Sequence, residues 1–175
     1  HVARKAAERG AALANYVEVT GFLKSGDRIC GAKTRDFEIA ADRVINATGV
    51  WCDELRTAAD PASSPALRPS KGVHLVLDAR RLRLKSAVML PSPDDGRIVF
   101  LIPWGDRVLV GTTDTDHVGD LDRPSATGAD IDYLLSVVNR NLPETYLTRR
   151  DVRSTYAGLR PLLLDGADAP SKVSR

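Results

Sequence analysis

One arginine stands between a glycine and a proline in the Gly-Leu-Arg-Pro sequence of residues 158–161. Glycine permits close backbone approach and proline restricts the chain that follows, so we expect a glycine turn that fixes the position of Arg160. A guanidinium group is always charged and binds planar anions through paired hydrogen bonds. The pattern is typical of a pocket for an anionic substrate or an electron-rich cofactor, and equally of an ion pair with a nearby carboxylate.

A histidine follows a glycine in the Lys-Gly-Val-His sequence of residues 71–74, on a predicted strand. Histidine is the side chain best suited to proton transfer near neutral pH, but a strand histidine is more often a hydrogen-bonded structural residue. Two hydroxyls, Thr112 and Thr113, and the carboxylate of Asp114 follow another strand. A capped turn would explain them equally well, so the residues alone leave both interpretations open.

A predicted short strand at 44–45 ends in three small residues, Ala47, Thr48 and Gly49. Such an end lets backbone approach a dinucleotide, although many parallel strands end in the same way. The acidic segment 114–122 resembles a calcium loop, but Val118 occupies the fifth position, which needs an oxygen ligand, and Ser125 stands where a bidentate glutamate is needed, so no metal site is predicted. No glycine-rich dinucleotide motif or phosphate-binding loop occurs in the sequence.

The hydrophobic pattern that must position these residues predicts an α+β fold, in which one helix covers an antiparallel meander. A helix over 2–9 ends at Gly10, and short strands within 11–22 precede a hairpin of 29–34 and 37–39. A proline- and serine-rich connection over 60–71 leads to four strands, followed by an amphipathic helix from Thr127 to Pro143 and a last strand. These five strands are expected at 72–77, 87–90, 97–104, 107–112 and 151–156.

The composition is that of a globular protein, with 43% hydrophobic and 27% charged residues. A formal net charge of +2 gives no reason to expect nucleic acid as a partner. No apolar run approaches the roughly 20 residues that span a bilayer. Cys30 and Cys52 have no metal-binding spacing and are expected to be reduced. The chain shows no signal peptide, and both of its ends resemble cuts, so we expect an internal piece of a longer protein.

Seven motif segments follow one another along nearly the whole chain. They are Val-Ile-Asn-Ala-Thr-Gly-Val-Trp at 44–51, Lys-Gly-Val-His at 71–74, Arg-Ile-Val-Phe-Leu-Ile-Pro-Trp at 97–104, Gly-Thr-Thr-Asp at 111–114, Asp-Tyr-Leu-Leu at 132–135 with Val-Asn at 138–139, Tyr-Ala-Gly-Leu-Arg-Pro-Leu at 156–162 and Ser-Arg at 174–175. Each motif is unremarkable alone, but in order and spacing the set resembles the family of FAD-dependent glycerol-3-phosphate dehydrogenases, within the D-amino-acid-oxidase-like flavoproteins.

The resemblance implies a glutathione-reductase-type FAD-binding α/β domain interleaved with a substrate-binding domain built on an antiparallel sheet. By this resemblance, residues 1–52 are part of the FAD-binding domain, residues 53–161 form the substrate-binding domain, and residues 162–175 return toward the FAD domain. The loop that binds the FAD phosphates and a C-terminal helical domain would lie outside the chain.

The reaction implied is oxidation of sn-glycerol 3-phosphate to dihydroxyacetone phosphate, with hydride transfer to FAD and electrons passed to quinone. His74 would be the base or hydroxyl partner, and Arg160 would lie beside flavin and substrate. The resemblance also implies substrate-binding and FAD-binding residues. For the substrate these are Arg175 and, more weakly, Thr112 and Thr113, and for FAD they are Val19, Ala47, Thr48 and Gly49.

The resemblance further implies a cytoplasmic protein held peripherally at the inner-membrane surface, and it leaves a homodimer open. Two flavoprotein alternatives stay open: a glycerol-3-phosphate oxidase, which passes electrons to oxygen, and another FAD-dependent oxidoreductase acting on amines or hydroxy acids. For the chain by itself, we expect a non-catalytic folded module without bound flavin.

Overall fold

The computed structural model describes residues 1–164, which form two compact units. The first unit combines His1–Thr48 with Cys52–Ser64, and the second combines Gly49–Trp51 with the chain from Pro65 onward. Both contain helices and antiparallel strands, so the predicted α+β class is confirmed. Arg175 and most of the predicted return segment, 162–175, lie outside the described residues.

The first unit is built on a small antiparallel sheet. Its helix α1 (Val2–Glu8) ends just before Gly10, which has a φ of +89° and so ends the helix as predicted. The sheet order is β1-β2-β3, and the hairpin predicted near residues 29–39 is formed by β2 and β3. The elements of this sheet and the helix that follows it are β1 (Val19–Ser25), β2 (Arg28–Thr34), β3 (Glu38–Ala40) and α2 (Cys52–Ala59).

Two strand predictions in the first unit are wrong. Residues 11–16 and 44–45 belong to no strand of the described chain. Ile45 is 88% exposed, and the next residue, Asn46, forms local side-chain bonds instead of leading out of a ladder. Its amide oxygen accepts from the N–H and hydroxyl of Thr48, and its amide nitrogen donates to the carbonyl of Cys52 at 3.0 Å. An asparagine that satisfies nearby polar groups in this way favours a turn over a strand.

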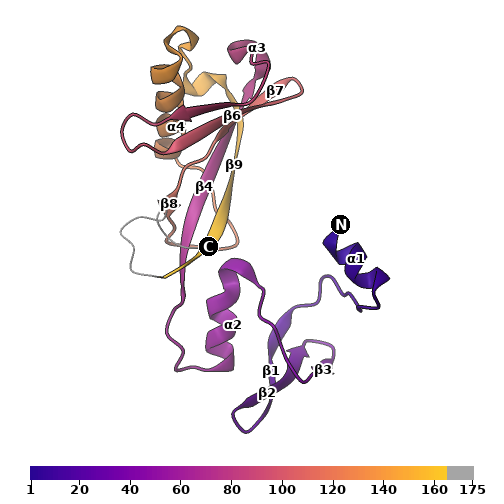
Figure 1. Cartoon of the computed structure of the whole chain (residues 1–175). Helices are drawn as coiled ribbons and strands as arrows, with labels where there is room; N and C mark the ends of the chain where they lie inside the picture. Colours follow the sequence, from indigo (N-terminus) through magenta and orange to yellow (C-terminus); the bar gives the residue numbers. More distant parts are fainter. Residues whose placement is uncertain (165–175) are drawn as a thin grey trace. The chain divides into compact units, whose positions relative to one another are not determined.

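The second unit contains a six-stranded sheet of order β5-β6-β7-β4-β8, with β9 paired to β4 (Figure 1). All of its strand pairs are antiparallel, and the predicted meander is confirmed for β5, β6 and β7. The strands are β4 (Leu67–Asp78), β5 (Val88–Pro91), β6 (Ile98–Trp104), β7 (Arg107–Gly111), β8 (Thr115–Asp116) and β9 (Val152–Leu163).

Strand β9 runs without interruption through residues 158–161, so the predicted glycine turn around Arg160 is wrong. The whole strand pairs with β4, and Pro161 lies opposite Pro69. Proline has no backbone N–H to donate, so two facing prolines are expected at a non-hydrogen-bonded pair of the two strands. Because β4 pairs with this long strand β9, it already begins at Leu67. The connection predicted over 60–71 is therefore shorter than expected.

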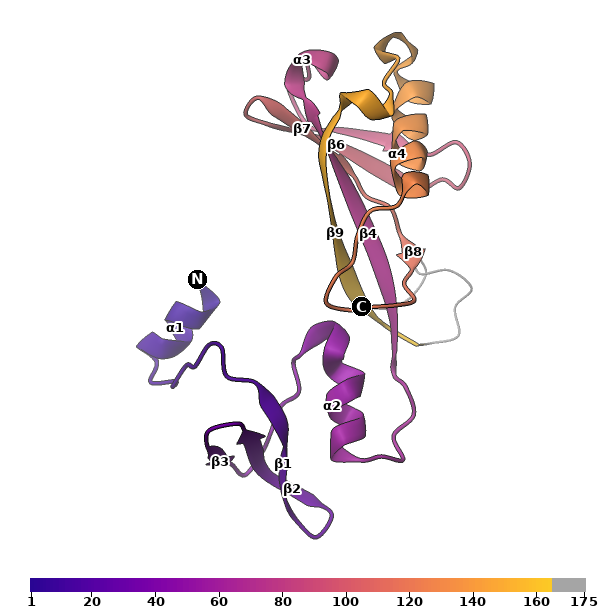
Figure 2. The same ribbon diagram turned by 180° about the vertical axis from the view of Figure 1, so that it is seen from behind.

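Helix α4 (Gly128–Asn141) covers one face of this sheet (Figure 2). It begins as predicted, because the Thr127 hydroxyl accepts from the N–H of Asp130 while the Asp130 carboxylate accepts from the N–H of Thr127. The core lies between the helix and the sheet, and it includes Val73, Leu75, Leu77, Leu101, Val110, Leu134 and Val138. The short helices α3 (Ala79–Leu82), η1 (Gly49–Trp51), η2 (Pro143–Thr145) and η3 (Arg149–Asp151) complete the unit.

Candidate functional site

The sheet face opposite α4 carries a row of aligned residues, and we call this face the open face. Phe100 on β6 pairs with Gly111 on β7, Gly111 pairs with His74 on β4, and His74 pairs with Tyr156 on β9. Because side chains alternate along a strand, these residues point away from the core residues Val73 and Leu75. The row is only partly covered, since Phe100 is 42% and Tyr156 is 48% exposed.

Two glycines make room for the polar side chains of the open face. A Cβ atom on Gly111 would lie 2.2 Å from Cδ2 of His74, and one on Gly72 would lie 2.6 Å from Nη2 of Arg160. Real Cβ atoms do not approach other atoms so closely, so the imidazole and the guanidinium lie flat against backbone that has no side chain. The imidazole also stacks on the ring of Tyr156, with centroids 4.8 Å apart and planes within 5°.

Arg160 is held by oxygen acceptors from the chain that follows β7. Its Nη1 lies 3.2 Å from Oδ1 of Asp114 and donates to the carbonyl of Thr113 at 3.4 Å, while Nη2 donates to Oγ1 of Thr112 at 3.3 Å. The ion pair that the sequence left open is therefore present. A guanidinium has five N–H donors, so these bonds leave capacity for an anion. The Arg160 side chain is 25% exposed and can reach such a ligand.

The environment of His74 favours its neutral form. Burial is the main cause that lowers its pKa below the ordinary value, and the positive charge of Arg160 lowers the pKa further. Both effects favour the unprotonated imidazole, which is the form able to accept a proton.

The two threonines predicted as weaker substrate contacts differ in exposure. Thr112 is partly buried, and its hydroxyl contacts Arg160. Thr113 is 2% exposed, and its hydroxyl accepts from the N–H of Val73 at 3.0 Å, which favours a role within the sheet.

The predicted FAD-contacting residues are divided between the two units. Val19, Ala47 and Thr48 belong to the first unit, and Gly49 belongs to the second. Val19 is 39% exposed, and Ala47 and Gly49 are exposed as well, so their backbone is open to a ligand. Their role in binding FAD stays a prediction, as does that of Arg175 outside the described residues.

The sequence analysis missed the residues that support Arg160 and His74. Ser70, Arg97 and Tyr156 were not singled out, and Asp114 was considered as a carboxylate after a strand, as a turn cap and in a rejected calcium loop, but not as the partner of Arg160. Strand alternation offers a signal for Ser70, because it places Ser70, Gly72 and His74 on one face of β4. The contact between Arg97 and Asp114 joins residues 17 positions apart, and those of Asp114 with Ser70 and Arg160 join residues still farther apart. No local pattern indicates these contacts.

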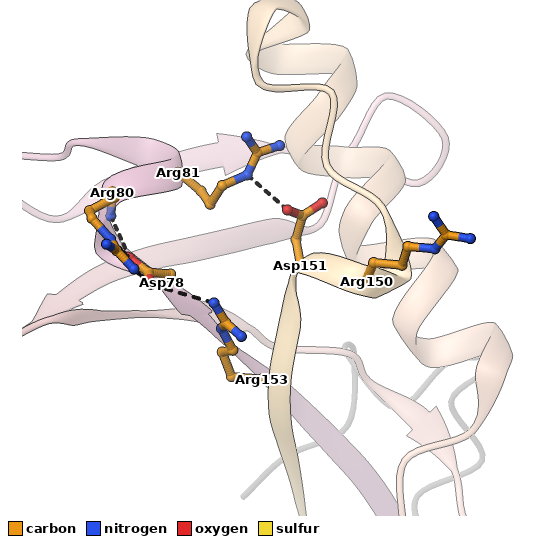
Figure 3. A pocket seen from close by; sticks show the side chains of 6 residues that line it. All are labelled: Asp78, Arg80, Arg81, Arg150, Asp151 and Arg153. Atoms are coloured by element: carbon orange, nitrogen blue, oxygen red, sulfur yellow. Dashed lines mark hydrogen bonds and ion pairs between the residues drawn. The ribbon is translucent and has the colours of Figure 1, made fainter.

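A second group of charged side chains lines a pocket of about 200 Å³ in the second unit (Figure 3). Asp78 binds Arg80 at 2.8 Å and also lies 3.7 Å from Arg153, while Asp151 binds Arg81 at 2.8 Å. Arg150 extends away from these side chains in Figure 3. Each carboxylate in the pocket is already matched by arginine, which is typical of an ion-pair network that joins α3 to the start of β9. Over residues 1–164, no three His, Cys, Asp or Glu side chains are grouped as a metal site requires.

Comparisons with known proteins show which family the chain belongs to. A family model described as FAD dependent oxidoreductase matches residues 1–171. The chain belongs to this family.

Members of the FAD dependent oxidoreductase family with similar sequences carry related names. The chain is 43% identical to the glycerol-3-phosphate dehydrogenase of Mycobacterium leprae, over 99% of this chain and 30% of that protein. It is 42% identical to the alpha-glycerophosphate oxidase of Streptococcus pneumoniae, over 91% of this chain and 28% of that protein. The chain thus spans less than a third of the length of these curated relatives.

A solved structure in the same family has a similar fold. It is the X-ray structure of the glycerol-3-phosphate dehydrogenase from Bacillus halodurans complexed with FAD. The TM-score is 0.84 at 38% sequence identity, and the match covers 94% of this chain and 34% of that one. The α+β fold with antiparallel sheets is therefore that of an FAD-binding oxidoreductase.

Proposed function

We propose that this chain is part of a flavoprotein that oxidises sn-glycerol 3-phosphate to dihydroxyacetone phosphate with FAD. The observation that carries the proposal is the placement of His74 and Arg160 on one face of the β4–β9 pair. An alcohol phosphate needs a base for its hydroxyl proton and a cation for its anionic charge. The names of the relatives, glycerol-3-phosphate dehydrogenase and alpha-glycerophosphate oxidase, support the same substrate.

The open face fits a flat, electron-rich ring such as that of FAD. It offers exposed apolar and aromatic side chains beside the polar ones, since Ile102 is 36% and Trp104 is 69% exposed. Gly72 and Gly111 keep the imidazole and guanidinium close to the backbone, so neither side chain projects far from the sheet. When bound, FAD supplies the hydride acceptor. The exposed residues Val19 and Ala47 of the first unit and Gly49 of the second would contact FAD, as would the partly buried Thr48 of the first unit.

In the second unit, His74, Arg160 and Tyr156 would have separate roles in the reaction. His74, kept neutral by burial and by Arg160, would accept the proton of the substrate hydroxyl at a ring nitrogen. Arg160 would donate to an anionic or electron-rich group with the N–H groups that the 112–114 segment leaves free. Tyr156, stacked on the imidazole, would fix the plane of the base and exclude water from one of its faces.

The electron acceptor and the setting of the reaction rest on family resemblance. By that resemblance, we propose that quinone accepts the electrons, that the protein acts at the inner-membrane surface and that it assembles as a homodimer. Within residues 1–164, no helix has the length and apolar character needed to cross a membrane. Oxygen is the acceptor in the oxidase alternative, and the name of one relative favours it.

The decisive experiment uses a protein that carries this sequence together with the remaining length of its relatives. We expect a yellow protein whose flavin is bleached anaerobically by glycerol 3-phosphate and not by glycine or proline. His74→Ala and Arg160→Ala should each lower turnover at least ~100-fold, the usual scale for a lost proton-transfer or electrostatic contact. Arg83→Ala, at an exposed position outside the open face, serves as the control. Bleaching by an amino acid instead of glycerol 3-phosphate would refute the substrate assignment.

Two further measurements complete the test. Reduction of a soluble quinone without hydrogen peroxide supports the dehydrogenase, and stoichiometric hydrogen peroxide supports the oxidase. The chain of 175 residues by itself is expected to be colourless and inactive. A yellow chain that reduces dyes with glycerol 3-phosphate would show that these residues alone suffice.

A further inference from the structure

Asp114 follows β7 and connects two side chains of different strands. Its carboxylate is 11% exposed and accepts from the hydroxyl of Ser70, a fully buried residue of β4. The same carboxylate oxygen lies 3.2 Å from Nη1 of Arg160 on β9. A carboxylate that is largely buried and bonded to side chains of two strands has little freedom to move. Its position therefore fixes the position of a cation that pairs with it.

The backbone of Asp114 is held independently of its carboxylate. Nη1 of Arg97 donates to the carbonyl of Asp114 at 2.7 Å. Arg97 is fixed in turn by Asp95, which accepts from its Nε at 2.7 Å, and by Tyr133, whose ring centroid lies 5.0 Å from the guanidinium carbon. Asp114 is thus anchored by Ser70 of β4 and by Arg97, which directly precedes β6 and is held by Tyr133 of α4.

The remaining contacts of Arg160 are weaker. The hydroxyl of Thr112 and the carbonyl of Thr113 accept from it at 3.3 and 3.4 Å, and both are neutral. Asp114 is the only carboxylate within ion-pair distance of Arg160 among the described residues. A charge-assisted hydrogen bond is roughly twice as strong as a neutral one, so the carboxylate decides where the guanidinium lies.

We propose that Asp114 is a positioning residue that holds the guanidinium of Arg160 flat over Gly72, next to His74. The arginine thereby presents its free N–H groups to the open face and lies close enough to disfavour protonation of the imidazole. The identity of the anion that Arg160 meets rests on the proposed function. The positioning itself does not, because it concerns only side chains of the described chain.

The proposal is tested by NMR titration of His74 in the chain of 175 residues, which has only His1 and His117 as further histidines. Asp114→Asn keeps the shape of the side chain and removes its charge. The released guanidinium should move toward solvent, so the pKa of His74 should rise, because a nearby positive charge disfavours the protonated imidazole. Arg160→Gln should produce a rise at least as large.

The double variant separates positioning from a direct effect of the carboxylate. In the Arg160→Gln background, Asp114→Asn should leave the pKa of His74 unchanged, because there is no guanidinium left to position. Asp116→Asn is the matched control, since Asp116 also binds an arginine, Arg68, through a short contact of 2.6 Å, yet it belongs to β8. This control should leave the pKa of His74 unchanged in either background.

Three outcomes overturn the proposal. The pKa of His74 could stay constant in Asp114→Asn, it could fall because Arg160 stays in place without its counter-charge, or it could shift equally with and without Arg160. None of these measurements requires flavin or substrate. A flavoprotein that oxidised another compound would therefore refute the proposed function and leave the positioning by Asp114 intact.

Discussion

Gly111 determines how close the imidazole of His74 can lie to the sheet. Replacing it with alanine would place a Cβ atom 2.2 Å from Cδ2 of His74, so the ring must swing away from β7. We expect Gly111→Ala to break the stacking of His74 on Tyr156 and to destabilise the chain by about 1–3 kcal/mol, the usual cost of overpacking. The ring-current shifts of both rings in NMR spectra and urea unfolding measure the two effects.

Gly158→Ala is the matched control for this prediction. Gly158 also lies on a strand, β9, and a Cβ atom there would meet no atom within 4 Å. We expect it to leave the stacking intact and to change the free energy of unfolding by less than about 0.5 kcal/mol, as is usual at unconstrained positions. Equal effects of the two substitutions would show that the close approach at Gly111 does not hold the imidazole.

At the scale of single residues, the sequence indicated candidate side chains but not the residues that support them. His74 and Arg160 were singled out because each lies two residues after a glycine. Local reasoning assigned the position of Arg160 to a turn at Gly158, whereas the glycine beneath its guanidinium is Gly72 on the neighbouring strand. The register between strands decides such contacts, and no local pattern of a single sequence contains it.

A buried ion pair joins helix α4 to strand β4. Nζ of Lys71 lies 2.7 Å from Oδ2 of Asp130, and the two side chains are 11% and 5% exposed. Removing one partner leaves the other charge buried, so we expect Lys71→Met to cost about 3–5 kcal/mol at pH 7. Arg149→Gln is the control, because the pair of Arg149 with Asp132 on the same helix is exposed to solvent and should contribute much less to the free energy of unfolding.

The effect of Lys71→Met should also depend on pH. Burial opposes ionisation of Asp130, but hydrogen bonds from Lys71 and Thr127 outweigh it and hold the pKa below its usual range. This contribution is fully present above the unfolded-state pKa of about 3.9 and is lost as the pH falls through the lower folded-state value. The destabilisation by Lys71→Met, measured by urea unfolding, should therefore be smaller at pH 3 than at pH 7. A constant difference would mean that Asp130 does not depend on the lysine.

At the scale of elements, the sequence predicted those whose signals are local. Helix α4 was located correctly because its capping box and its apolar spacing lie within one segment. Strand β9 was expected to end at Tyr156 because glycine and proline usually interrupt strands. Its continuation depends on β4, which places Gly72 opposite Gly158 and Pro69 opposite Pro161. Helix α3 was missed because only four residues form it, too few for a periodic pattern.

At the scale of the whole molecule, the two units differ sharply in how much they bury. In the first unit, all of whose residues are described, Gly31 is the only buried residue. Two of its apolar residues are open to solvent, since Phe37, just before β3, is 45% exposed and Ile39 on β3 is 47% exposed. The hydrophobic core cluster lies entirely in the second unit. Since burial of apolar surface is the main stabilising contribution, most of the folding free energy must reside in the second unit.

This difference predicts separate unfolding of the two units in the chain of 175 residues. Local opening needs less free energy where few apolar contacts are lost, so amides of β1 and β2 should exchange at least about 100-fold faster than those of β4. Hydrogen exchange followed by mass spectrometry can compare the two strand pairs within one sample. The hairpin of β6 and β7 is the internal control, because it has the same antiparallel hydrogen bonding as β1 and β2 but places Leu101 and Val110 in the core. Similar protection of both hairpins would mean that backbone hydrogen bonds, and not core burial, determine the stability of the first unit.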